Sequence, residues 1–231
     1  MTLFSGVHAP FINAHTHVEE TLFPEPVQRR EEILSFPSFT PGDVIPGEIR
    51  YFSAGYHPTK AGSFSEEALR ILLEDPRCVA VGECGLDPFV PVEWEVQQEI
   101  FLRQLFLARE YGKRMVIHCV RRFPEILSLR KKEWQDPEIP WLIHGFRANE
   151  TIGKSLLKAN CILSLSPVWL RHLQEFPLWL EKEKFLLETD MEDTGVLPEL
   201  YSKCASLCGE DLSSLREHLN HTFRRFLGLP G

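Results

Sequence analysis

The chain places six potential metal ligands at the ends of five short apolar segments. They are His15 and His17 after FINA, Glu83 after CVAVG, His118 after RMVI, His144 after PWLI and Asp190 after FLLET. Histidine and carboxylate are the side chains that bind divalent first-row metals and Mg²⁺ in proteins. Apolar segments that all end in a ligand predict parallel strands whose carboxyl ends meet around one site. That arrangement is the geometry of a (β/α)₈ barrel.

Strand and helix signals alternate along the chain, which is typical of βαβ units and a parallel sheet. The expected strands cover residues 11–14, 33–36, 49–55, 79–82, 115–117, 141–143, 161–165 and 185–188. The expected helices cover residues 94–111, 123–130, 149–158, 168–184 with an interruption at Pro177, 198–208 and 211–227. Ser63 and Glu66 resemble a capping box that opens one more helix, ending at Leu73.

The number of strands depends on residues 19–48, which are rich in Pro and Glu. They contain only one weak strand candidate, residues 33–36, and leave little room for a helix after it. We therefore expect an eight-stranded barrel with a shortened second βα unit, and a seven-stranded or distorted barrel is the alternative. No repeat or linker interrupts the chain, so we expect one domain over residues 1–231.

The composition restricts the possible partners. With 25 Lys plus Arg against 33 Asp plus Glu, the net charge is −8, which argues against a broad positive surface for duplex nucleic acid. A small phosphoester remains compatible, because bound dications would supply local positive charge. No segment is long and apolar enough for a bilayer, and the first residues lack a signal-peptide pattern. The six cysteines form no CxxC pair, so we expect a cytoplasmic protein with reduced thiols.

The first three candidate ligands have spacings that suit a shared site. His15 and His17 lie two residues apart in an expected strand, so their side chains point to the same face. In a barrel that face is the interior, and both imidazoles can reach one metal. Glu83 follows a strand in the sequence GECGLD, whose glycines let the backbone bend sharply. A carboxylate in this position can bridge two cations.

The other three candidates follow strongly apolar strands. A lone histidine in the place of His118 or His144 is more often a core residue than a ligand. Two of them at the same end of successive strands favour ligation. Asp190 would be a carboxylate at the barrel mouth, where it needs a cation or hydrogen-bond donors. It could bind one metal and also take a proton from the attacking water.

The ordered motifs HTH, GYHP, GECGLD, VIHC, LIHGF and LLETD resemble those of the TatD-related DNases. This family is a branch of the metal-dependent hydrolases on a TIM barrel. The matching motifs run from Asn13 to Asp190, and residues 97–108 (QQEIFLRQLFLA) also match. The resemblance implies hydrolysis of phosphodiesters in DNA with Mg²⁺ or a transition metal. We therefore expect two divalent cations as cofactors, Mg²⁺, Mn²⁺ or Zn²⁺.

The resemblance also implies a role for each ligand. One metal would be held by His15, His17, Glu83 and Asp190. The second would be held by Glu83, His118 and His144, so that Glu83 bridges the two. Glu83 and Asp190 would be the catalytic residues, and His57 of GYHP would lie beside the site.

The sequence departs from the family pattern around the substrate. Asn13 stands where the family usually has Asp, and Val120 where it commonly has Arg. HGFR replaces HCFSG, which puts Arg147 in place of a small residue, and residues 191–195 (MEDTG) replace a Pro-rich segment. All six ligand positions survive. Metal binding is therefore a firmer expectation than the identity of the substrate.

Three residues are candidate substrate contacts. Arg121 and Arg147 each lie three residues past a predicted ligand, His118 and His144, so both can reach the rim of the site. Their planar guanidinium groups suit phosphate. His57 is the third candidate.

Three functions compete. The first is a two-metal phosphodiesterase that acts on DNA ends or short single strands, with no obligatory protein partner and no membrane. The second is a metal-dependent amide or lactone hydrolase of the same superfamily. Those branches often carry a lysine at the bridging strand, where this chain has Glu83. The third is a non-catalytic, metal-stabilised binding protein, because a fold and a ligand set do not fix function.

Overall fold

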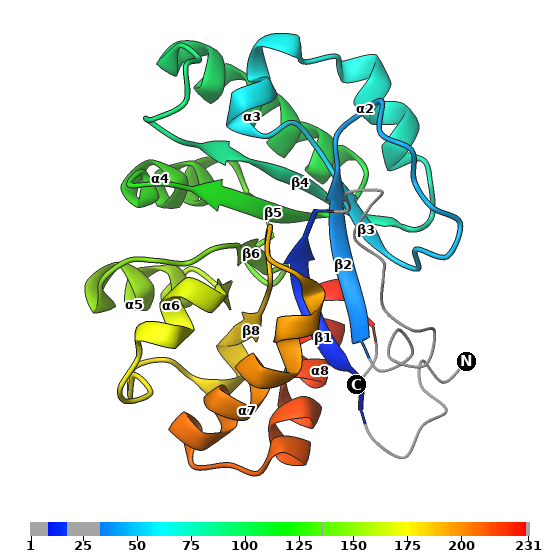
Figure 1. Ribbon diagram of the computed structural model, residues 1–231. Helices are drawn as coiled ribbons and strands as arrows, with labels where there is room; N and C mark the ends of the chain where they lie inside the picture. Colours follow the sequence, from blue (N-terminus) through cyan, green and yellow to red (C-terminus); the bar gives the residue numbers. More distant parts are fainter. Residues whose placement is uncertain (1–8, 18–32, 135, 230–231) are drawn as a thin grey trace.

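The computed structural model describes residues 9–17, 33–134 and 136–229. Eight parallel strands follow one another around a barrel in sequence order, with the helices outside it (Figure 1). The strands are β1 (Phe11–Thr16), β2 (Ile33–Phe39), β3 (Phe52–Ala54), β4 (Cys78–Leu86), β5 (Arg114–Cys119), β6 (Trp141–Ile143), β7 (Cys161–Leu165) and β8 (Phe185–Leu187). The eight-stranded barrel is therefore confirmed, and the seven-stranded alternative is wrong.

The helices largely follow the sequence pattern. They are α2 (Glu66–Leu73), α3 (Trp94–Glu110), α4 (Phe123–Glu133), α5 (Glu150–Lys158), α6 (Pro167–His172), α7 (Leu197–Cys208) and α8 (Leu212–Leu227). Short 3₁₀ turns are η1 (Pro58–Ser63), η2 (Lys182–Lys184) and η3 (Thr194–Val196). Asn149 caps α5 by accepting a hydrogen bond from Ile152 N at 3.0 Å. None of the helices in the described ranges is long and apolar enough to cross a membrane.

Several expected boundaries differ from the structure, and three of them matter for the fold. Ser65, not Ser63, caps α2, because its Oγ accepts a hydrogen bond from Ala68 N. Helix α6 ends at His172 and does not continue to residue 184. Strand β4 does not stop at Gly82 but continues through the predicted ligand position to Leu86.

The second βα unit is shortened, as the sequence predicts. Residues 40–51, between β2 and β3, contain turns but no helix. Helix α8 covers this part of the barrel, where Phe36 of β2 packs against Phe223 and Phe226 with ring centroids 5.6 and 5.9 Å apart. Residues 18–32, which include part of the Pro- and Glu-rich segment, lie outside the described residues. One domain over residues 1–231 therefore stays a prediction.

The seam between β1 and β8 is closed in two different ways. At the carboxyl ends, His17 N donates to Asp190 O at 3.3 Å and Asp190 N donates to His15 O at 3.1 Å. Nearer the amino end, the hydroxyl of Tyr201 from α7 forms hydrogen bonds with the backbone of β1. It accepts from Ile12 N at 2.8 Å and donates to Ile12 O at 3.1 Å. A buried side chain thus satisfies the backbone groups of β1 that no strand pairs there.

We expect Tyr201→Phe to destabilise the barrel without changing its packing volume. The variant leaves the buried N–H and C=O of Ile12 unpaired, which should lower the free energy of unfolding by about 1–3 kcal/mol. Urea unfolding would measure this loss. The control is Tyr111→Phe, whose hydroxyl makes only a long contact of 3.4 Å with Arg70. Equal stability of the two variants would contradict the role of Tyr201 at the seam.

Candidate metal centre

The Glu83 carboxylate is the centre of a cluster of histidines at the carboxyl ends of the strands. Its two oxygens face different histidines. Oε2 lies 3.0 Å from His17 Nε2 and 3.4 Å from His15 Nε2. Oε1 lies 2.6 Å from His144 Nε2, 2.7 Å from His118 Nδ1 and 3.6 Å from His57 Nε2. Glu83 is only 5 % exposed, so these imidazoles replace most of its water.

An irregularity in β4 brings Glu83 into the barrel. The register between β4 and β5 shifts by one residue between Val81 and Cys84, so the strand bulges at this point. Gly82 and Gly85 flank the bulge with positive φ angles of 140° and 157°. A Cβ atom at either glycine would overlap the backbone of β5. The two glycines therefore let the strands approach while the carboxylate between them turns inward.

Two of the imidazoles have a buried carboxylate beside their second nitrogen. His118 directs Nδ1 to Glu83, while its Nε2 lies 3.2 Å from Asp87 Oδ2. His144 directs Nε2 to Glu83, while its Nδ1 makes no hydrogen bond but lies 3.5 Å from Glu188 Oε1. Such carboxylate–histidine pairs fix the ring and make the other nitrogen a better metal ligand.

His15 is oriented by a hydroxyl and leaves one nitrogen free for a ligand. Its Nδ1 lies 3.3 Å from Ser38 Oγ on β2, which in turn contacts Ser53 Oγ on β3. Its Nε2 is completely buried and has no hydrogen-bond partner among the described residues. A buried nitrogen that faces carboxylates without a hydrogen bond is the donor that a cation would occupy.

Asp190 lies on the other side of the His15 and His17 pair. Its Oδ1 is 3.8 Å from the Nε2 atom of each. The residue has a left-handed φ of 54°, and its neighbour Thr189 is held from β1. Asn13 Oδ1 accepts from Thr189 N at 2.9 Å, and Asn13 Nδ2 donates to Thr189 Oγ1 at 2.8 Å. The Asn13 amide therefore positions the turn that carries Asp190.

The electrostatics of the cluster favour a cation between its carboxylates. Burial alone would raise the pKa of Glu83, but His144 and the hydrogen-bonded imidazoles hold it well below its usual value. Burial would lower the pKa of His144, yet Glu83 and Glu188 raise it well above the ordinary value. These opposite shifts mean that the fold stabilises positive charge at this point. A metal ion would satisfy the same requirement.

His57 is a neutral neighbour of the cluster. Burial lowers its pKa to about 4, and His118, His144 and His17 add to the effect against the opposing charge of Glu83. Its Nδ1 accepts a hydrogen bond from Thr59 N at 3.2 Å. The proton of the neutral ring is therefore on Nε2, which faces the cluster.

The donor atoms form overlapping sets that suit metal ions. In three groups of three residues, all the donor atoms lie within 4.8 Å of one another: His15, His17 and Glu83; His57, Glu83 and His118; and His15, His144 and Asp190. All six predicted ligands thus gather at one end of the barrel, and His57 joins them. The nitrogen and oxygen donors fit divalent transition metals and Mg²⁺.

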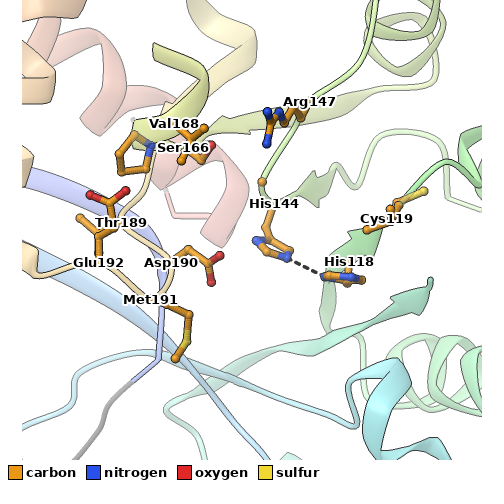
Figure 2. A pocket seen from close by; sticks show the side chains of 13 residues that line it. His118, Cys119, His144, Arg147, Ser166, Val168, Thr189, Asp190, Met191 and Glu192 are labelled. Atoms are coloured by element: carbon orange, nitrogen blue, oxygen red, sulfur yellow. Dashed lines mark hydrogen bonds between the residues drawn. The ribbon is translucent and has the colours of Figure 1, made fainter. Parts of the chain in front are cut away.

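A pocket of about 330 Å³ opens beside His118, His144 and Asp190 (Figure 2). Arg147 lines it and is exposed, as a phosphate contact requires. Glu192 also lines it, but its carboxylate is paired with the two terminal guanidinium nitrogens of Arg171, at 3.0 and 2.7 Å. Its charge is therefore partly neutralised at the pocket.

Arg121 lies elsewhere than Arg147. It is not among the residues that line this pocket, and its guanidinium carbon lies over the ring of Phe89, 5.1 Å from the ring centroid. Arg121 is also exposed, with a left-handed φ of 54°.

The sequence interpretation missed the residues that orient the ligands. Asp87 and Glu188 had a signal, because both stand inside the motifs GECGLD and LLETD. Each is an even number of residues from a predicted ligand, so it shares a face with that ligand in an extended chain. Ser38 has no signal of this kind, because only the pairing of β2 with β1 brings it beside His15.

Comparison with known proteins gives consistent matches. The sequence profile of the TatD related DNases matches residues 47–228. A metal-dependent hydrolase of Mycobacterium tuberculosis named TatD is 30% identical over 153 residues, 61% of this chain and 57% of the relative. A 3′–5′ single-stranded DNA/RNA exonuclease of Klebsiella pneumoniae is 26% identical over 77% of this chain and 76% of the relative. A human 3′–5′ RNA nuclease is 30% identical over 64% of this chain but 21% of its own length.

Solved structures share the fold. A TatD homologue from Escherichia coli superposes with a TM-score of 0.73 at 19% identity, covering 95% of this chain and 98% of its own. A TatD family hydrolase from Entamoeba histolytica gives 0.74 at 13% identity, with coverage of 96% and 99%. The profile match spans strands β3 to β8 and four of the six candidate ligands, and the solved structures agree with it in fold. The chain therefore belongs to the TatD related DNase family.

Proposed function

We propose that this chain is a two-metal phosphodiesterase that acts on the ends or short single strands of nucleic acids. The proposal rests on the arrangement of the histidines around the Glu83 carboxylate, whose two oxygens face different pairs. Oε2 lies beside His15 and His17, and Oε1 lies beside His118 and His144. A bridging carboxylate with separate histidines on each oxygen is suited to two adjacent cations.

The relatives support nucleic acid as the substrate class. Two of the compared proteins are named as 3′–5′ nucleases, one for single-stranded DNA and RNA and one for RNA. The alignments cover 57% and 58% of the length of the mycobacterial relative and of a Bacillus subtilis relative. Activity and substrate are therefore proposed for this chain from its own site. A cytoplasmic location, suggested by the sequence, stays a prediction.

Each residue has a definite part in the proposed site. One cation would be held by His15, His17, Glu83 and Asp190, and the other by Glu83, His118 and His144. Two cations would lower the pKa of an attacking water and neutralise phosphate oxygens. Asp190, whose side chain is 38 % exposed, can accept the proton of that water at its carboxylate. His57 can donate its Nε2 proton to a phosphate oxygen, and Arg147 can contact the phosphate from the pocket wall.

We expect the protein, reconstituted with Mn²⁺ or Mg²⁺, to shorten a labelled single-stranded oligonucleotide faster than the matching duplex. Asp190→Asn should lower turnover by roughly a hundredfold or more, because Asn keeps the shape but cannot accept the proton. Gel analysis of the labelled products measures both effects. The control is Asp136→Asn, an exposed carboxylate that caps Glu138 N. Near-normal turnover of Asp190→Asn would show that another group activates the water.

The same assays should include an amide and a lactone. Metal-dependent turnover of either one, with no cleavage of any phosphodiester, would overturn the proposed function. If the protein binds metal but turns over neither the phosphodiester, the amide nor the lactone, the remaining function is that of a metal-stabilised binding protein.

We expect Asn13→Asp to lower the stability of the metal-free protein and to raise its affinity for metal. A carboxylate can still accept from Thr189 N, but it adds a charge at a completely buried position. The metal-free variant should therefore melt lower by roughly 5 °C. Added Mn²⁺ should reduce this difference, because the extra charge favours the cations. Calorimetric melting with and without Mn²⁺ tests this, and an equal loss in both states would contradict it.

A further inference from the structure

The rim of the metal centre carries an exposed aromatic ring with an arginine on it. The side chain of Phe89 is 65% exposed, and Arg121 lies over its ring. Arg121 follows the predicted ligand His118 by three residues, and Phe89 follows Asp87, which contacts His118 at 3.2 Å. The pair therefore stands on the loops after β4 and β5, beside the site and outside its pocket.

The loop that presents Phe89 is held in place. Gln97 of α3, which is 2% exposed, accepts from Asp87 N at 2.9 Å and donates to Val92 O at 2.8 Å. Asp87 also accepts from Phe89 N at 2.8 Å. The backbone on both sides of Phe89 is thus tied to one buried side chain. The ring is preorganised at the surface, and little freedom would be lost when a ligand packs on it.

Arg121 is available to a second partner. Among the residues that the structure describes, its guanidinium makes no hydrogen bond or ion pair, although its flat face lies against Phe89. The N–H edge of a stacked guanidinium can still bind phosphate oxygens. Arg121 lies in the turn after β5 with a left-handed backbone conformation, which is uncommon for a residue other than glycine.

We propose that Phe89 and Arg121 form a stacking subsite for one nucleobase of a single-stranded nucleic acid whose neighbouring phosphate lies at the metal centre. The proposal rests on the proposed function. Proteins that bind single strands without sequence preference combine aromatic platforms for bases with cations for the backbone. An aromatic ring and an arginine in contact, at the rim of a phosphodiesterase site, provide both.

The subsite also explains why an acidic protein can take a polyanionic substrate. With a net charge of −8, the chain gains little from long-range attraction to nucleic acid. Stacking on an uncharged ring does not depend on that attraction. A base held in a duplex has both faces covered and cannot use the platform, so the subsite favours frayed or single-stranded ends.

The chain contains a matched control for Phe89. Phe106 of α3 is also exposed, at 47%, and Arg109 lies over its ring at 5.8 Å from the centroid. The same pair of side chains thus occurs on the outer helix layer, away from the metal centre. Both pairs therefore consist of an exposed phenylalanine with an arginine over its ring, and they differ in their distance from the candidate metal centre along the fold.

The test compares a short single-stranded oligonucleotide with an abasic chain of the same length. Affinities are measured by fluorescence anisotropy with Ca²⁺ in place of Mn²⁺, so that binding is measured separately from hydrolysis. Phe89→Ala should weaken binding of the base-bearing chain roughly tenfold and leave the abasic chain nearly unchanged. Phe89→Trp should preserve binding, and Phe106→Ala should change neither affinity. Arg121→Ala should weaken both chains and reduce the salt dependence by about one phosphate contact.

Equal effects of Phe89→Ala on the two chains, no effect on either, or an equal effect of Phe106→Ala would overturn the subsite. So would equal affinity of the unmodified protein for the two chains. Hydrolysis is measured separately with Mn²⁺. A protein that binds bases through Phe89 but cleaves no phosphodiester would refute the proposed function and leave the stacking subsite standing.

Discussion

The contact of one buried carboxylate with five imidazoles is the interaction on which the site depends. Glu83 reaches His15 and His17 with one oxygen and His57, His118 and His144 with the other. These residues lie in or just after four strands and just before η1, so only the closed barrel brings them together. Without a cation, the imidazoles hold the pKa of Glu83 well below its usual value against the effect of burial, and Glu83 and Glu188 raise the pKa of His144. In the proposed site, the same donor atoms would be ligands of the cations.

The contact that closes the barrel also positions part of the candidate site. Strands β1 and β8 pair only at their carboxyl ends, through the backbone of Asp190. That contact sets Asp190 beside His15 and His17, and Asn13 fixes the adjacent Thr189. Nearer the amino end, Tyr201 completes the hydrogen bonds of β1 from outside the sheet. The seam is thus closed by backbone hydrogen bonds at the end that carries the candidate site and by a side chain nearer the amino end.

Much of this could be predicted from the sequence, because strand ends follow from apolar runs and ligand types are recognisable. The barrel, the gathering of the six candidate ligands at one end of it and the short second unit follow from that pattern. The continuation of β4 beyond Gly82 was missed, since glycines in a sequence indicate a turn as readily as a bulge. Ser38, and the contact of Phe89 with Arg121, which was expected only as a phosphate contact, were missed for another reason. Their roles depend on contacts between segments, which periodicity does not contain.

The most direct test of the account is a crystal structure of the protein with excess Mn²⁺, with the ions located by their anomalous scattering. We predict two ions about 3.5–4 Å apart, one on each side of the Glu83 carboxylate. His15 and His17 should bind one ion, and His118 and His144 the other. A single ion, or ions bound away from Glu83 in crystals of active protein, would contradict the bridging role of this carboxylate.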